Sequence, residues 1–259
     1  MRAIFRLLKI VGLFVGVAIV ALVGLLVVTF SGGAPIQDGQ RLGAVEVVKD
    51  GFVSAFIIDI GNHDIALVDA GNDRQAKAIL AALVKRNLGI DAVKAILLTH
   101  GDRDHTAGVA AFPHAAVMAL DADIPLAEGR ELRGFFRFFG SPHPNGIKVV
   151  RGLHDGESLT LGNQLVRVFA VPGHTKGSAA FLLAGVLFLG DSADARHSGT
   201  LAAGRWLFTE NPAQNRASLR NLLMEIKPWA GEVKAIACAH SGMLTSGLTP
   251  LFEFVALER

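Results

Sequence analysis

Four side chains of the kinds that bind metal ions lie within six positions of the sequence. They directly follow an almost continuous apolar run over residues 92–98, and they are His100, Asp102, Asp104 and His105. Polar and ionisable groups cost free energy to bury, so a cluster this dense needs a compensating partner. Imidazole and carboxylate groups are ligands of divalent first-row metal ions. The segment therefore predicts either a metal site or, more simply, a polar loop in which Asp104 caps a helix.

Three more polar residues follow apolar runs further along the chain. His174 lies in a Pro-Gly-His-Thr turn, Asp191 follows Leu-Gly, and His240 follows Cys-Ala. Sites in α/β proteins are built just beyond the ends of strands. We therefore expect these three residues to converge on the first cluster, which favours the metal site over the simple loop.

In this order the residues resemble the signature of the metallo-β-lactamase superfamily. That signature is His-x-His-x-Asp-His, then a His in a Pro-Gly-His-Thr-like loop, then an Asp and a last His. The resemblance covers residues 45–242, and Val68-Asp69-Ala70-Gly71 is similar to a frequent early motif of the family. It implies an α/β fold: a four-layer αββα sandwich in which each of two sheets carries helices on its outer face.

The resemblance also implies a binuclear site. One metal ion takes His100, Asp102 and His174, and the other takes Asp104, His105 and His240, with Asp191 bridging both. Asp69 is expected to support a His ligand from behind, although an Asp-x-Gly turn is an equally good interpretation.

The sequence departs from the family pattern at one ligand, since Asp102 stands where the second His usually lies. A carboxylate still binds metal, but it is a harder donor that suits iron or manganese better than imidazole does. We expect two divalent ions, with zinc the first expectation and iron or manganese the alternatives. Flavodiiron members of the family also carry an acidic residue there, together with a flavin domain for which this chain has no counterpart.

These features predict a metal-dependent hydrolase that acts on a small-molecule substrate. A water held between two cations becomes a hydroxide near neutral pH, and Asp104 is expected to orient it as the catalytic carboxylate. The substrate is a small ester, thioester, lactam or phosphoester, and the sequence does not choose among them. The alternatives are a di-iron redox enzyme, suggested by Asp102, and a non-catalytic metal-binding envelope protein.

The apolar pattern predicts the elements that position these residues. Strands are expected over 44–48, 53–60, 65–68, 92–98, 165–171, 179–183, 186–189 and 234–239, and helices over 73–87 and 212–226. Strands followed by a helix and a buried strand occur twice. That repetition is consistent with two sheets, each covered by helices.

The N-terminus predicts a membrane helix. Residues 10–30 carry no charge and match the roughly 20 residues that cross a bilayer, while Arg2, Arg6 and Lys9 favour a cytoplasmic N-terminus. We divide the chain into an anchor (1–30), a linker (31–43) and the folded domain (44–259). The domain is expected on the extracytoplasmic, periplasmic side. A signal peptide that is cleaved to release a secreted form is the alternative.

The charge and the cysteine content limit which binding partners and covalent links the chain can have. The formal charge is +2, but three of the 25 basic residues and no acidic residue precede the apolar run, so the remainder carries −1. Nucleic acid is therefore not expected as a partner. The single cysteine, Cys238, excludes an intrachain disulfide, and the oligomeric state cannot be read from the sequence.

Residues 130–139 are rich in arginine and phenylalanine. Arg133, Phe135, Phe136 and Arg137 suggest a substrate lid over the metal site. An amphipathic segment resting on a membrane surface is a second interpretation, and an outer helix packed on the core is a third.

Overall fold

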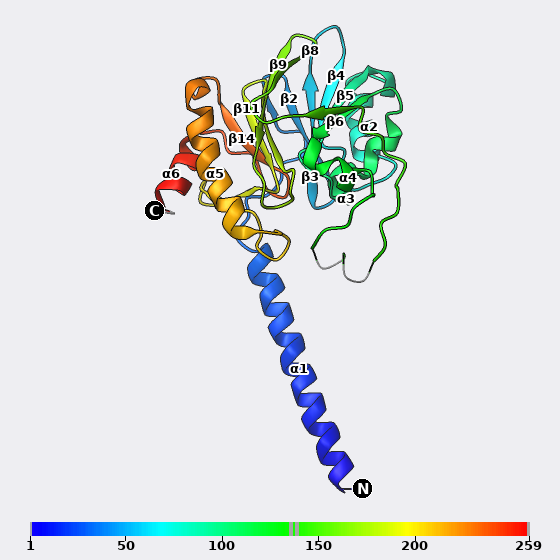
Figure 1. Ribbon diagram of the computed structural model, residues 1–259, viewed down its shortest axis with the longest axis vertical. Coiled ribbons are helices and arrows are strands. Elements are labelled where there is room, and N and C mark those ends of the chain that lie inside the picture. Colours follow the sequence, from blue (N-terminus) through cyan, green and yellow to red (C-terminus); the bar gives the residue numbers. More distant parts are fainter. Residues whose placement is uncertain (1, 135–136, 138–139, 258–259) are drawn as a thin grey trace. The chain divides into compact units, whose positions relative to one another are not determined.

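The computed structural model describes residues 2–134, 137 and 140–257, in two compact units (Figure 1). The first unit ends at Gly32 and consists of one helix, α1 (Arg2–Phe30). Its stretch Val11–Thr29 is long and apolar enough to cross a membrane, a property that signal sequences share. The second unit begins at Gly33 and holds Asp69 and all seven predicted metal ligands.

The first sheet of the second unit has seven strands in chain order. Their bounds are β1 (Arg41–Leu42), β2 (Val45–Asp50), β3 (Val53–Asp59), β4 (Ile65–Val68), β5 (Val93–Leu97), β6 (Ala116–Leu120) and β7 (Arg151–Leu153). Strands β1 to β4 pair antiparallel, whereas β4 to β7 pair parallel. The parallel half directs the carboxyl ends of β4, β5 and β6 to one edge of the sheet.

The second sheet has five strands in the order β14-β11-β10-β9-β8. Their bounds are β8 (Ser158–Leu161), β9 (Gln164–Ala170), β10 (Ala179–Leu183), β11 (Val186–Gly190) and β14 (Ala235–Cys238). Only β11 and β14 pair parallel. A separate hairpin is formed by β12 (Ala193–Ala195) and β13 (Leu201–Ala203).

The two sheets pack face to face, because alternate residues of each strand point to opposite faces. In β3, Phe56 and Ile58 join the core between the sheets, where Phe56 meets Phe188 of β11 edge to face. Their neighbours Ala55 and Ile57 are buried on the outer face of the first sheet. Strands buried on both faces explain the continuous apolar runs of the sequence.

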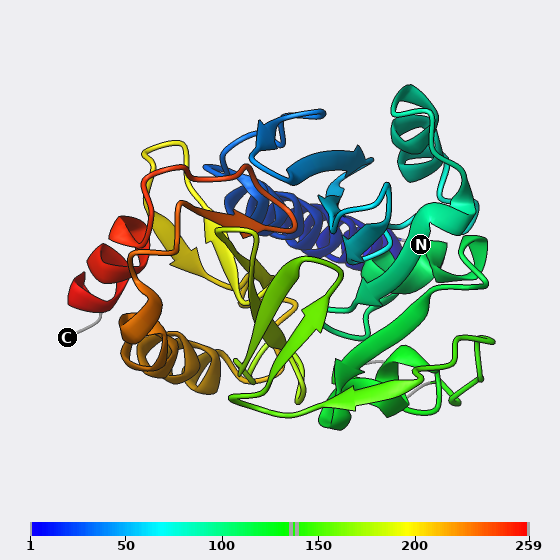
Figure 2. The same ribbon diagram turned by 90° about the horizontal axis from the view of Figure 1, so that it is seen from above.

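Helices cover both outer faces and complete four layers. On the first sheet lies α2 (Lys77–Lys85), which buries Ile79 and Leu83. On the second lie α5 (Pro212–Ile226) and α6 (Thr249–Leu257). Figures 1 and 2 show α5 and α6 (orange and red) on one side of the sandwich and α2 on the other. The short helices α3 (Arg103–Thr106) and α4 (Ile124–Ala127) complete the set.

The segment expected as a linker over 31–43 is largely part of the domain. Ala34 N donates to the carbonyl of Ala195, and Gly242 N donates to the carbonyl of Ala34. Further along, β1 pairs with β2, and Gly39 N donates to Val47 O. The backbone groups of this segment find protein partners, which a free Gly- and Ser-containing tether would leave to water.

Candidate metal centre

All seven predicted ligand residues lie beyond the carboxyl ends of strands. His100 follows β5, and Asp104 and His105 lie in α3 directly after it. His174, Asp191 and His240 follow β9, β11 and β14 of the second sheet. The site is therefore built where the two sheets meet, with three residues from loops of each sheet and Asp102 at the N-cap of α3.

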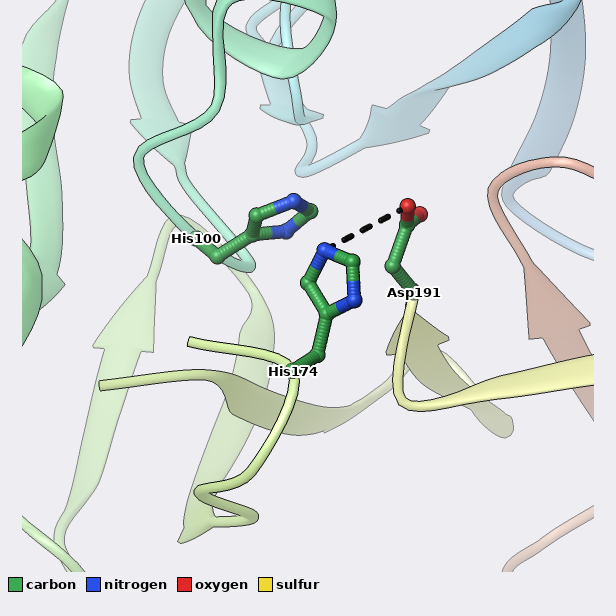
Figure 3. A group of neighbouring side chains, drawn as sticks. All are labelled: His100, His174 and Asp191. Atoms are coloured by element: carbon green, nitrogen blue, oxygen red, sulfur yellow. Dashed lines mark ion pairs between the residues drawn. The ribbon is translucent and has the colours of Figure 1, made fainter. Parts of the chain in front are cut away.

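His100, His174 and Asp191 form the first group of side chains that can hold a metal ion (Figure 3). The ring centroids of His100 and His174 lie 4.7 Å apart, and His174 Nε2 lies 3.6 Å from Asp191 Oδ2. Asp102 Oδ2 lies 3.4 Å from the Nε2 atoms of both histidines.

Asp104, His105 and His240 form the second group. His240 Nε2 lies 3.2 Å from Asp104 Oδ2 and 3.0 Å from Asp191 Oδ2. His105 Nε2 lies 3.2 Å from Asp191 Oδ1. Asp191 thus stands between the two groups, with His174 on one side and His105 and His240 on the other.

Every one of these imidazoles is held through Nδ1, so that Nε2 faces the centre. The Nδ1 partners are Thr99 Oγ1 for His100 (3.1 Å), Asp69 Oδ2 for His105 (2.8 Å), Thr209 Oγ1 for His174 (3.4 Å) and the carbonyl of Phe52 for His240 (3.0 Å). A partner on the second ring nitrogen fixes both ring orientation and tautomer. The pattern is that of histidines oriented to bind metal through Nε2.

Asp69 is the most tightly embedded of these supports. It follows β4 and has a φ of 59°, which places its backbone in the left-handed region. It is fully buried, and its carboxylate accepts hydrogen bonds from Thr99 N, Thr99 Oγ1 and His105 Nδ1. The Asp69 carboxylate thus connects the end of β5 at Thr99 to the ring of His105.

The donor set fits a metal ion. His100 Nε2, His105 Nε2 and Asp191 Oδ1 are buried and have no hydrogen-bond partner among the described residues. Buried polar atoms are nearly always satisfied, and leaving one unpaired costs free energy. Imidazole nitrogens and carboxylate oxygens aimed at one another from the segments after four strands are satisfied together by a cation.

The electrostatics of the second group couple imidazoles to carboxylates. Although burial disfavours the imidazolium of His105, Asp69 and Asp191 raise its pKa well above the usual value. Burial disfavours the charged form of His240, but Asp191 and Asp104 favour it more strongly. The pKa of His240 is therefore raised to about 10. In turn, His240 and His105 hold the pKa of Asp191 well below its usual value against the effect of burial. The carboxylates of the second group therefore favour positive charge at its centre.

Arg133 reaches this centre from the segment predicted to be a lid. Its Nε donates to Asp102 Oδ1 (2.5 Å), its Nη2 donates to Asp102 Oδ2, and Nη2 also lies 3.0 Å from His174 Nε2. Its Nη1 donates to the carbonyls of His174 (3.2 Å) and Phe208 (2.6 Å). Despite burial, Arg133 and then His100 and His174 hold the pKa of Asp102 well below its usual value.

Of the other predicted lid residues, the structure describes Arg137 alone. Arg137 is exposed, and Phe135 and Phe136 lie outside the described residues. The outer helix predicted over residues 130–139 falls partly outside the described residues.

Asp123 is a positioning residue that the sequence did not reveal. It is buried, and its carboxylate accepts from Gly101 N (2.5 Å) and Gly177 N (2.9 Å). It thereby ties the loop that carries His100 to the loop that carries His174. A Cβ at Gly101 would meet Ala127 N at 2.4 Å, so only glycine permits this approach. No local pattern around Asp123 could have indicated a contact between two distant loops.

Comparisons with known proteins agree with this geometry. Residues 48–233 match the profile of the Metallo-beta-lactamase superfamily, and the chain belongs to that superfamily. The expectation from the sequence motifs is thereby confirmed.

Among curated relatives, the chain is similar to a hydroxyacylglutathione hydrolase of Yersinia pestis, with 31% identity over 70% of this chain. A hydroxyacylglutathione hydrolase of Aeromonas hydrophila is 30% identical over 78% of this chain. The chain spans 58% and 65% of the lengths of these two relatives.

Solved structures share the fold. A B3 metallo-beta-lactamase with an active-site glutamic acid superposes with a TM-score of 0.65 at 21% identity, covering 86% of this chain and 87% of the other. A beta-lactamase from Chitinophaga pinensis gives 0.61 at 23% identity, covering 80% and 79%. The two mixed sheets and their outer helices are therefore those of the metallo-β-lactamase fold.

Proposed function

We propose that this protein is a binuclear metal-dependent hydrolase of a small acyl compound, acting outside the cytoplasm. One observation carries the proposal: four imidazole Nε2 atoms and the carboxylates among them converge from both sheets, with buried unpaired donor atoms between them. Membership of the superfamily and the names of the relatives support the same class of reaction.

The proposed ligands are the two groups with Asp102 added to the first. One ion is assigned to His100, His174 and Asp102, the other to Asp104, His105 and His240, with Asp191 shared. When bound, such ions polarise a substrate carbonyl and lower the pKa of water.

The chain's own residues orient the reaction. Asp69 and the Phe52 carbonyl fix the rings of His105 and His240. Asp104 keeps its carboxylate ionised, since His240 and His105 lower its pKa against burial, so its Oδ2 can accept a hydrogen bond from the attacking water. We assign Asp104 the role of aligning that water with the carbonyl carbon.

The rim of the site favours a substrate with an apolar portion. Phe52 is 59% exposed and stacks on the ring of His240, with centroids 5.7 Å apart. Trp206 and Phe208 are also more than two-fifths exposed, and the bond from Arg133 to the Phe208 carbonyl holds their loop beside the site. Exposed aromatic side chains beside polar groups are typical of pockets that bind organic ligands.

A thioester is the first substrate class to test, because the curated relatives are hydroxyacylglutathione hydrolases. Zinc remains the first expectation for the metal. Iron is the alternative, because Asp102 is a harder donor than imidazole, and the metal content of the purified protein decides between the two ions.

The decisive experiment compares two histidine variants of the full-length chain in detergent. His105→Ala removes a fully buried Nε2 of the second group, whereas His114→Ala changes an exposed histidine outside the site. Metal content by mass spectrometry and turnover of thioester, ester, lactam and phosphoester substrates should fall together only in His105→Ala. Unchanged turnover in His105→Ala, or in chelator-treated protein without metal, would refute the proposal.

For location, we propose that α1 is an uncleaved anchor and that the domain lies on the periplasmic side. The apolar stretch Val11–Thr29 and the basic residues before it support this. Protease added to intact spheroplasts should digest the domain, and a mass measurement should find α1 still attached. A mature chain that begins after residue 30 would establish the signal peptide instead.

A further inference from the structure

Both oxygens of the Asp102 carboxylate accept hydrogen bonds from Arg133. The planar fork of Arg133 donates to Oδ1 through Nε and to Oδ2 through Nη2, the bidentate arrangement that makes Arg–carboxylate pairs strong. The two side chains are only 17% and 20% exposed, so water screens the pair weakly. Oδ2 is also the oxygen that faces the Nε2 atoms of His100 and His174.

The same guanidinium stands against a second ligand atom of the first group. Arg133 Nη2 lies 3.0 Å from His174 Nε2, the atom that would have to bind a metal ion. Two backbone carbonyls, of His174 and Phe208, hold Nη1 on the other side. Five acceptor atoms on three residues thus fix Arg133 at the position where its charge opposes a cation bound by His100, Asp102 and His174.

The second group has a different environment. The ligand atoms of Asp104, His105 and His240 face one another and Asp191 at 3.0 to 3.8 Å. His105 and His240 are held from behind by a carboxylate and a carbonyl, which leave their Nε2 atoms directed at the centre. A metal ion can bind here without displacing Arg133.

We propose that the Arg133 guanidinium and a metal ion exclude each other at His100, Asp102 and His174, so that the two metal groups fill in order. The group of Asp104, His105 and His240 binds first, and the other binds only when Arg133 leaves Asp102. The presence of Asp rather than His at position 102 is what makes this possible, since an imidazole cannot accept the bidentate, charge-assisted pair that a carboxylate accepts. This inference rests on the metal ligands assigned under the proposed function.

The test is calorimetric titration of metal-stripped, full-length protein with Zn²⁺. The wild type should bind one equivalent tightly and a second at least about tenfold more weakly. Arg133→Gln should tighten the second equivalent by about ten- to a hundredfold, the equivalent of one charged hydrogen bond removed from competition. Arg137→Gln makes the same charge change at an exposed position of the same segment and should leave both affinities unchanged.

Two further measurements separate competition from a general charge effect or a folding defect. Arg133→Lys keeps the charge but loses the fork, so its second site should tighten less than that of Arg133→Gln, and it decides the question if the Gln variant does not fold. In Arg133→Ala, millimolar guanidinium chloride should weaken the second equivalent, whereas equal sodium chloride should not.

The outcomes are distinguishable. Two equivalents of similar affinity in the wild type, unchanged in Arg133→Gln and Arg133→Lys, would overturn the exclusion and leave the hydrolase proposal standing. Failure of every protein, wild type included, to bind Zn²⁺, Fe²⁺ or Mn²⁺ would overturn the proposed function itself.

Discussion

Replacing Asp69 with Asn tests whether the hydrogen-bonded frame behind the ligands controls metal binding. The Asp69 carboxylate accepts three hydrogen bonds of 2.8 Å, two from Thr99 and one from His105 Nδ1. An Asn side chain has the same shape, but its NH₂ meets a donor in either orientation. The Thr99 peptide N–H cannot change, whereas His105 can move its proton to Nε2. That tautomer places a hydrogen on the atom that faces the second metal group.

The expected loss follows from the bond that is removed. A hydrogen bond to a buried charged group contributes about 1.5–3 kcal/mol. With about 1.4 kcal/mol for each factor of ten, metal affinity at the second group should fall about ten- to a hundredfold, the range typical for partners that orient metal-bound histidines.

Competition with a coloured chelator measures this affinity directly. Asp91→Asn is the matched control, because Asp91 also lies near a histidine, His114 at 3.9 Å, but both side chains are more than 70% exposed. It should bind metal as the wild type does. If Asp69→Asn retains wild-type affinity while remaining folded, the Asp69–His105 bond does not orient the ligand and the argument fails.

Three other predictions address protons, loop anchoring and close packing. The pKa of His240 in the metal-free protein is raised to about 10, so its contribution to the free energy of unfolding should be complete below about pH 6.5 and lost as the pH rises through 10. Urea unfolding in the presence of a chelator should show this pH dependence, and His240→Gln should abolish it. Asp123→Ala removes the acceptor of two buried amides and should lower the free energy of unfolding by about 3 kcal/mol. Asp121 is exposed, so Asp121→Ala should change it little, and equal urea midpoints for the two variants would contradict the anchoring role of Asp123. Gly101→Ala should cost about 1–3 kcal/mol through its backbone clash, while Gly89→Ala, which has open space, should not; thermal unfolding compares the two.

The sequence indicated most of what is local. Strands β3, β4, β5, β10 and β11 are apolar runs ended by turns, so their bounds agree with the prediction within a residue or two. The ligand residues could be found because each follows such a run directly. The short strands β7, β12 and β13 have three residues each, too few for a periodic pattern to emerge.

Contacts across the fold could not be read from the chain. Asp102 and Arg133 are 31 positions apart, and both had local interpretations, as a ligand and as part of a lid. The segment over 31–43 has the composition of a tether, yet its backbone pairs with Val47 and Ala195, which no local pattern reveals. Such partners are set by tertiary packing rather than by propensity.

The division of the ligands between the two sheets has a mechanical consequence. A cation bound by Asp191 of one sheet and His105 of the other would link the two sheets, so separating them would require the cation to dissociate. The linkage strengthens with ion concentration as ligand-coupled stability does, without any covalent bond. Removal of the metal would therefore weaken the coupling between the two sheets and lower the free energy of unfolding.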